Sequence, residues 1–272
     1  MNTKYSKLLK IYIEKLKYFK YSPHTVSSYA HYVEKFLIKI DKYPQHLTGA
    51  DFQKYLDNFS FSSISQQNQI ISAIKLLYEK VLKRKYKKID FQRPRKKKKL
   101  PQIIDYDFAA RKISQIRNLK HKAILSIPFT TGLRVSEILN LKITDIDSDR
   151  MIIIVHQGKG NKDRIVPLSQ QLLELLREYY LKYRPKNYLF EGQFNEKYSP
   201  ASCNKICKKH LGYDTHMHLL RHTYLTFLAD HNVNINTMQN IAGHKSPKTT
   251  EIYVHTSVAT LANLPTPNLK SA

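Results

Sequence analysis

The chain has 272 residues, 42% of them hydrophobic, which is enough for about two domains with cores of their own. Its 46 Lys and Arg against 21 Asp and Glu give a formal net charge of +25. This charge indicates nucleic acid as a partner, or failing that an anionic membrane surface, although an AT-rich coding bias would also enrich lysine. The charged N-terminus excludes a secretory signal, and the longest aliphatic run, residues 151–155, is too short to span a membrane, so we expect an intracellular protein.

The first third of the chain carries only helical patterns. Apolar residues recur with a period near 3.6 over 4–20, 22–40, 49–59 and 63–82. The second of these segments opens with Ser22 and Pro23, a common helix start. No strand pattern precedes residue 90. We therefore predict a helical domain of about four helices over residues 1–85.

The composition changes abruptly over residues 83–101, which contain eleven Lys or Arg and one acidic residue, Asp90. Two prolines and self-repelling charge oppose a packed element there. We predict a basic linker over residues 86–103 that lies along a phosphate backbone; the alternative is a solvated surface segment. The cations expected to contact DNA are Arg93, Arg95, Lys96, Lys97, Lys98 and Lys99.

Residues 104–272 predict a larger, mostly α domain with a small antiparallel β-sheet. Strand patterns over 149–157 and 164–168 flank the segment GKGNKD, whose glycines suit a hairpin. Helical patterns cover 106–116, 120–132, 134–142, 169–183, 199–211, 216–230, 234–244 and 246–255. The fold class expected for the whole chain is therefore mainly α.

The stretch HLLRHT, residues 218–223, places two histidines and an arginine on a leucine-rich helix. Arg221 keeps its charge and needs an anion, yet no acid lies within a turn on its face, so a phosphate ligand fits its guanidinium. His218 lies on the same face. A zinc-protease pattern fails because position 219 is Leu rather than Glu. The alternative is that these residues are structural.

Four further residues are candidate site residues, although none of them is strong evidence of a site by itself. Arg134 lies at a junction between two predicted helices and could point into a cleft, or could simply pair with Glu137. Lys159 lies in the predicted hairpin, where lysines are usually just solvated. His244 lies at a predicted helix end, and Tyr253, nine residues later, is one of nineteen tyrosines.

The two cysteines, Cys203 and Cys207, lie four residues apart on a predicted helix. We expect them to be small apolar residues of a reduced protein. His210 makes a zinc site conceivable, but no fourth ligand is suggested nearby. No metal is predicted.

Five segments in this order and spacing resemble the catalytic domain of the tyrosine recombinase (phage integrase) family, and most closely its Xer-like members. They are TGLR, GKGNKDR, HLLRHT, AGHKS and TTEIYVH. SPHTVSSYAHYVEKFL resembles the start of that family's helical core-binding domain. The one departure is Ala242, where leucine is more usual, a difference of packing. The resemblance implies a catalytic set of Arg134, Lys159, His218, Arg221, His244 and the nucleophile Tyr253.

This resemblance implies a site-specific DNA recombinase that forms a 3′-phosphotyrosyl intermediate without metal, ATP or other cofactor. His218 would be the base, Lys159 would protonate the leaving 5′-oxygen, and His222 would face the interior as a structural residue. The implied partners are double-stranded DNA carrying a recombination site, three further copies in a tetramer that passes through a Holliday junction, and in some systems a partner recombinase or activator.

The two domains would clamp duplex DNA in the bacterial cytoplasm or nucleoid, and the tail 257–272 would pack on a neighbouring subunit or fold back. The role would be chromosome-dimer resolution or the integration and excision of a mobile element. The alternatives are a type IB topoisomerase-like enzyme and a non-catalytic DNA-binding protein.

Overall fold

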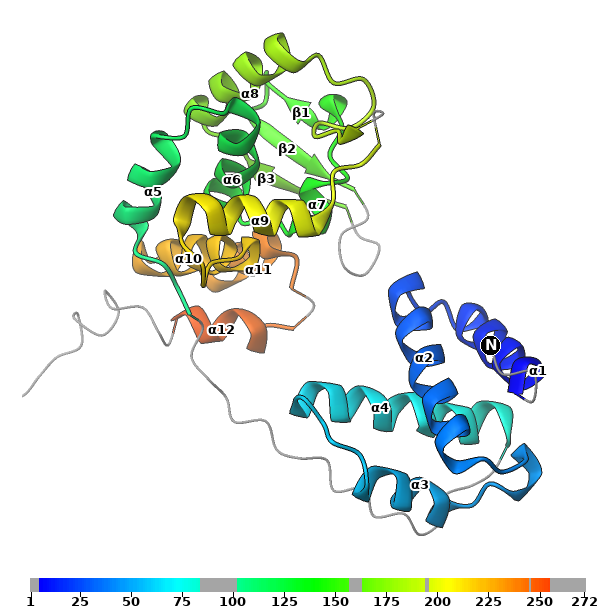
Figure 1. Cartoon of the computed structure of the whole chain (residues 1–272). Helices are drawn as coiled ribbons and strands as arrows, with labels where there is room; N and C mark the ends of the chain where they lie inside the picture. Colours follow the sequence, from blue (N-terminus) through cyan, green and yellow to red (C-terminus); the bar gives the residue numbers. More distant parts are fainter. Residues whose placement is uncertain (1–4, 84–101, 157–162, 194–195, 245, 255–272) are drawn as a thin grey trace, which may run out of the picture. The chain divides into compact units, whose positions relative to one another are not determined.

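The computed structural model describes residues 5–83, 102–156, 163–193, 196–244 and 246–254 (Figure 1). The chain divides into two compact units, Met1–Lys98 and Lys99–Ala272. Each unit has its own hydrophobic core. Among the helices described, none has the length and apolar character that a membrane crossing requires.

The described residues of the first unit form four α-helices, as predicted, and a short 3-10 helix, Pro44–His46. The α-helices are α1 (Ser6–Tyr18), α2 (Pro23–Ile40), α3 (Gly49–Asp57) and α4 (Ile64–Leu76), and α4 continues into a π-helical turn, Leu77–Val81. The Ser22 hydroxyl caps α2, and Thr48 with Asp51 forms a capping box on α3. An aromatic cluster around Phe36 fills the core, with ring centroids 5.2 to 6.2 Å apart.

The second unit is mostly helical with one small antiparallel sheet, which confirms the predicted fold class. Its helices are α5 (Tyr106–Ser114), α6 (Leu119–Thr131), α7 (Val135–Ile138), α8 (Gln170–Tyr183), α9 (Pro200–Leu211), α10 (Met217–Asp230), α11 (Ile235–Ala242) and α12 (Lys248–Val254). The sheet has the order β1 (Ile146–Asp147), β2 (Ile152–Val155), β3 (Arg164–Pro167). The sequence predicted β2 and β3 but not β1.

Helices α6 and α10 pack together in the core of this unit (Figure 1). Residues Ala123–Phe129 of α6 are buried on all sides, so α6 shows no amphipathic face. The helix ends at Gly132, whose φ of +67° favours glycine. A Cβ there would lie 2.8 Å from the Tyr224 ring of α10, so glycine also permits the close approach of the two helices.

Candidate active site

Four structural elements of the second unit bring their polar side chains to one place. Arg134 caps the N-terminus of α7, just after α6 ends. Arg221 lies in the first half of α10, His244 follows the C-terminus of α11, and Tyr253 lies in α12. Five of the six residues expected to be catalytic are therefore described, and a hydrogen bond joins two of them directly, Arg221 and His244.

Arg221 is 1% exposed, and the hydrogen bonds that it donates go to protein acceptors. Its Nη1 donates to the carbonyl of Gly132, and its Nη2 donates to the carbonyl of Ala242 at 2.6 Å and to Nε2 of His244 at 3.0 Å. Its buried Nε has no partner among the described residues. Burial and then Arg134 lower its pKa to about 10, so the guanidinium stays charged at neutral pH.

His244 has its tautomer fixed by these contacts. A guanidinium only donates, so Nε2 of His244 accepts from Arg221, and Nδ1 carries the proton and donates to Oγ1 of Thr250 at 2.9 Å. Burial, followed by Arg221 and Arg134, lowers the pKa of His244 to about 3. In this conformation the ring is neutral and orients Arg221, and its Nε2 is not a donor.

The hydroxyl of Tyr253 forms a 2.5 Å hydrogen bond with Nδ1 of His222. The expectation that His222 is a structural residue facing the interior stays a prediction; in the structure its half-buried ring meets the hydroxyl of the candidate nucleophile. Tyr253 itself is 1% exposed. Burial raises the pKa of Tyr253 to about 12, against the opposing effect of Arg221 and Arg134. Burial, His218 and Arg221 lower the pKa of His222 to about 4, so that ring is neutral.

His218 is exposed and lies one helical turn before His222. The two imidazoles meet edge to face, with centroids 4.4 Å apart. Desolvation by the surrounding protein, and then Arg221, lower the pKa of His218. Within the described residues no hydrogen bond joins His218 to Tyr253. The ring is placed where an incoming ligand can reach it.

Arg134 shares the buried carboxylate of Glu137 with a second arginine that the sequence did not single out. Arg134 donates to Glu137 through its backbone N–H and Nη1, both at 2.8 Å, and to the carbonyl of Gly243 through Nη2 at 3.0 Å. Arg164, the first residue of β3, donates to both oxygens of Glu137 at 3.0 and 2.7 Å. Its place at the end of GKGNKDR was a signal that could have identified it.

Two sets of predicted site residues lie outside the described residues. Lys159 falls within 157–162, and the six linker cations, Arg93, Arg95 and Lys96–Lys99, fall within 84–101. Their roles stay predictions. The cysteines are described: Cys203 and Cys207 are buried in α9, and burial raises the pKa of both thiols, to about 12 and about 11.

His210, the third member of the conceivable zinc set, meets another histidine rather than the thiols. Its Nε2 lies 3.0 Å from Nδ1 of His121. Desolvation lowers the pKa of both rings, so the pair is neutral and one nitrogen donates to the other.

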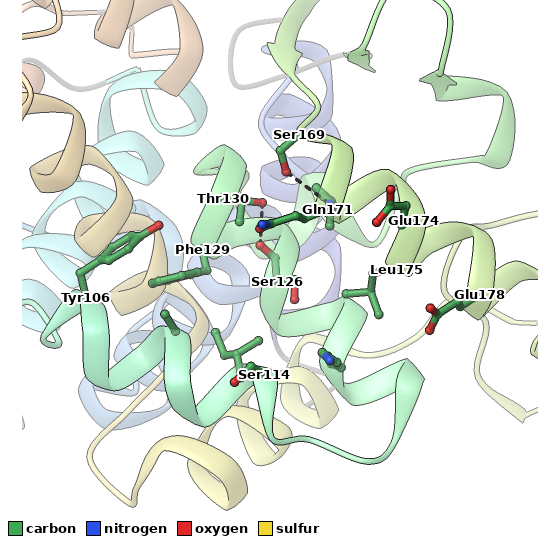
Figure 2. A pocket seen from close by; sticks show the side chains of 14 residues that line it. Tyr106, Ser114, Ser126, Phe129, Thr130, Ser169, Gln171, Glu174, Leu175 and Glu178 are labelled. Atoms are coloured by element: carbon green, nitrogen blue, oxygen red, sulfur yellow. Dashed lines mark hydrogen bonds between the residues drawn. The ribbon is translucent and has the colours of Figure 1, made fainter.

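A pocket of about 380 Å³ lies elsewhere in this unit, between α5, α6 and α8 (Figure 2). Figure 2 shows Tyr106 and Phe129 on one side and Glu174 and Glu178 on the other. No candidate catalytic residue lines it. Its two carboxylates would repel a phosphate, whereas the cluster of arginines and histidines would attract one.

Comparisons with known proteins cover both units. Residues 96–259 match the phage integrase family, and residues 8–88 match the phage integrase N-terminal SAM-like domain. A putative integrase/recombinase of Sinorhizobium fredii is 34% identical over 244 residues, covering 86% of this chain and 79% of that protein. Tyrosine recombinase XerA of Pyrococcus horikoshii is 34% identical over 247 residues, covering 85% and 83%.

Solved structures of recombinases are also similar to this chain. The crystal structure of XerA recombinase matches with a TM-score of 0.54 at 30% identity, covering 94% of this chain and 95% of that one. XerH site-specific recombinase, bound to a palindromic difH substrate in a post-cleavage complex, matches with a TM-score of 0.72 at 22% identity, covering 87% and 77%. Because its sequence identity is only 22%, the XerH match supports the fold alone.

Proposed function

Because the chain belongs to the phage integrase family, we propose that it is a site-specific DNA recombinase that cleaves and rejoins DNA through a 3′-phosphotyrosyl bond to Tyr253. The observation that carries this proposal is the convergence of one tyrosine hydroxyl with Arg221, His222 and His244 from three separate elements. A phosphodiester is the substrate that one buried arginine cation, two imidazoles and one nucleophile suit.

The proposed chemistry follows from the charges. Attack by Oη of Tyr253 on the scissile phosphorus builds negative charge on the non-bridging oxygens, which Arg134 and Arg221 stabilise. The P–O5′ bond breaks, and Lys159 protonates the leaving 5′-oxygen. The exposed His218 contacts the phosphate. The phosphotyrosyl bond conserves the energy of the broken linkage, so rejoining by a 5′-hydroxyl needs no energy source.

The described conformation is a resting state in this scheme. Tyr253 is 1% exposed, and Arg221 is occupied by two carbonyls and His244. DNA must therefore displace α12 or its contacts before Oη reaches a phosphate. Release of Nε2 of His244 from Arg221 would also allow that ring to donate to the phosphate after a change of tautomer.

Two histidines are candidates for the proton of Tyr253, and the contact favours His222. A general base must lie within hydrogen-bond reach of the proton that it accepts and must itself be neutral. Nδ1 of His222 lies 2.5 Å from the hydroxyl of Tyr253, and the lowered pKa of His222, about 4, leaves the ring neutral and able to accept the proton. The expectation that His218 is the base stays a prediction that the following experiment tests.

We expect His222→Asn to slow cleavage by about 10²-fold, the range of general base catalysis. The Asn amide lies near the position of Nδ1, so it keeps the hydrogen bond but cannot carry the proton away. The single-turnover rate should rise tenfold per pH unit in the variant, because phenolate must form first, and stay flat in the wild type. The groups facing His222 are His216, which caps α10, and His218 and Arg221 on α10, with Tyr253 and His244 opposite.

The matched control is His231→Asn at the exposed end of the same helix, which should cleave at the wild-type rate. A His222→Asn variant that cleaves faster than wild type would make the hydrogen bond a restraint on Tyr253 and not a route for its proton. An unchanged rate in that variant, with the loss found in His218→Asn, would assign the base to His218.

The remaining parts of the proposal concern assembly. We propose a helical core-binding domain over 1–85, a basic linker over 86–103 whose cations neutralise phosphates, and a catalytic domain over 104–272. The structural neighbours include the Tn1549 transposon integrase in complex with transposon right end DNA, and XerH bound to difH. They support DNA as the partner. The working assembly that we propose is a tetramer on two duplexes that passes through a Holliday junction.

Covalent capture tests the function directly. Purified protein is incubated with genomic DNA of its source, quenched with SDS, and the protein-linked DNA ends are sequenced, with Tyr253→Phe in parallel. We expect adducts at one recurrent sequence, lost in the variant. Adducts without sequence preference would favour a topoisomerase-like enzyme. No adduct even on nicked duplexes, which trap the intermediate, would favour a DNA-binding protein without chemistry.

A further inference from the structure

Arg164 has its guanidinium bonded to protein on every nitrogen. Nη1 and Nη2 donate to the two oxygens of Glu137, and Nε donates to the carbonyl of Ile241 at 2.9 Å. Both oxygens of Glu137 also accept from Arg134. One buried carboxylate thus serves two arginines from different elements, α7 and β3.

The charges of Arg134, Arg164 and Glu137 do not cancel. Burial alone would raise the pKa of Glu137, but the hydrogen bond from Arg164 and those from Arg134 hold it below its usual value, so the carboxylate is ionised. Two guanidinium charges against one carboxylate leave one positive charge. Without Arg164, Glu137 would neutralise Arg134 alone, and in a buried setting that pairing is strong.

Arg164 also holds the segment between α11 and His244. Its Nε binds the carbonyl of Ile241, and a Cβ at Gly243 would lie 3.1 Å from its guanidinium carbon. Gly243, with φ of +59°, presents its own carbonyl to Nη2 of Arg134 at 3.0 Å. The same arginine therefore fixes the second acceptor that orients Arg134.

We propose that Arg164 is a positioning residue of the catalytic centre, which neutralises Glu137 and so leaves the charge of Arg134 available to the scissile phosphate. It acts through Glu137 and contacts no reacting atom. The inference rests on the proposed function, because the charge of Arg134 matters for catalysis only if a phosphate binds beside it.

The test is a charge-balanced pair of substitutions, assayed by single-turnover cleavage of a duplex carrying the captured sequence. Arg164→Gln should slow cleavage by about 10²-fold at an unchanged DNA dissociation constant, comparable to the loss of one donor to the transition state. Adding Glu137→Gln should make the double variant about tenfold faster than Arg164→Gln, because Arg134 is no longer neutralised. Arg164→Lys, which keeps the charge but not the fork, should be intermediate.

The control is Arg150→Gln, which removes the same charge from an exposed pair with Asp147 in the β1–β2 turn and should cleave normally. Rates are compared per folded molecule, from thermal unfolding of each variant. A double variant slower than Arg164→Gln would overturn the proposal and leave Arg164 a structural residue. A wild-type chain that forms no adduct would instead remove the proposed function, before any variant is compared.

Discussion

Replacing Tyr253 with phenylalanine is expected to abolish the covalent protein–DNA adduct while the protein still folds and binds DNA. The substitution removes only the hydroxyl, which is the proposed nucleophile. The substitution removes the hydrogen bond to the half-buried His222, worth about 1 kcal/mol. Cleavage should fall below detection, because no neighbouring group in the described site offers a replacement hydroxyl at the position of Oη.

The measurement is an SDS-quenched cleavage assay beside a binding titration and a thermal unfolding curve on the same preparation. Tyr213→Phe is the matched control, since Tyr213 is 81% exposed in the same unit, and it should behave as wild type. Adduct formation by Tyr253→Phe at the wild-type rate would exclude Tyr253 as the nucleophile. Loss of the adduct together with loss of binding would indicate a structural role for the hydroxyl.

Local patterns were sufficient to predict the helices. The start signal at Ser22 and a 3.6-residue period predicted α2, and the period alone predicted α3; both helices form. The predicted helix over 134–142 is shorter in the structure, Val135–Ile138. The carbonyl of Leu141 instead accepts from the N–H of Leu189 at 2.7 Å, a contact that no local pattern reveals. Strand β1 has two residues, too few for any period.

The candidate site was predictable as a set of residues but not as a set of contacts. His218 and His222 lie four residues apart on one helical face, so the sequence could not say which of them meets Tyr253. That choice depends on where α12 packs against α10. Arg164 and Glu137 are 27 residues apart, and only the folded chain makes them partners. The segment GKGNKDR could mark Arg164 as a candidate, but nothing local could identify Glu137 as its partner.

Replacing Arg221 with lysine is expected to combine the largest loss of stability with a large loss of cleavage. The guanidinium holds the carbonyls of Gly132 and Ala242 and the ring of His244 together, and a compact ammonium cannot reach all three. A buried acceptor left without its donor costs about 1–3 kcal/mol, so we expect the free energy of unfolding to fall by about 2–4 kcal/mol. Cleavage per folded molecule should fall by about 10²–10³-fold.

Urea unfolding and single-turnover cleavage at a temperature where the variant is folded separate the two effects. Arg177→Lys on the exposed surface of α8 is the matched control and should change neither quantity. Arg221→Met separates charge from shape, because it fills the site without a charge and should lose still more cleavage than the lysine variant. Since Arg221 joins the end of α6 to the segment before His244, a stable lysine variant with normal cleavage would mean that this junction is held by packing alone. The buried Nε, the nitrogen of Arg221 without a partner among the described residues, would then have no role toward a phosphate.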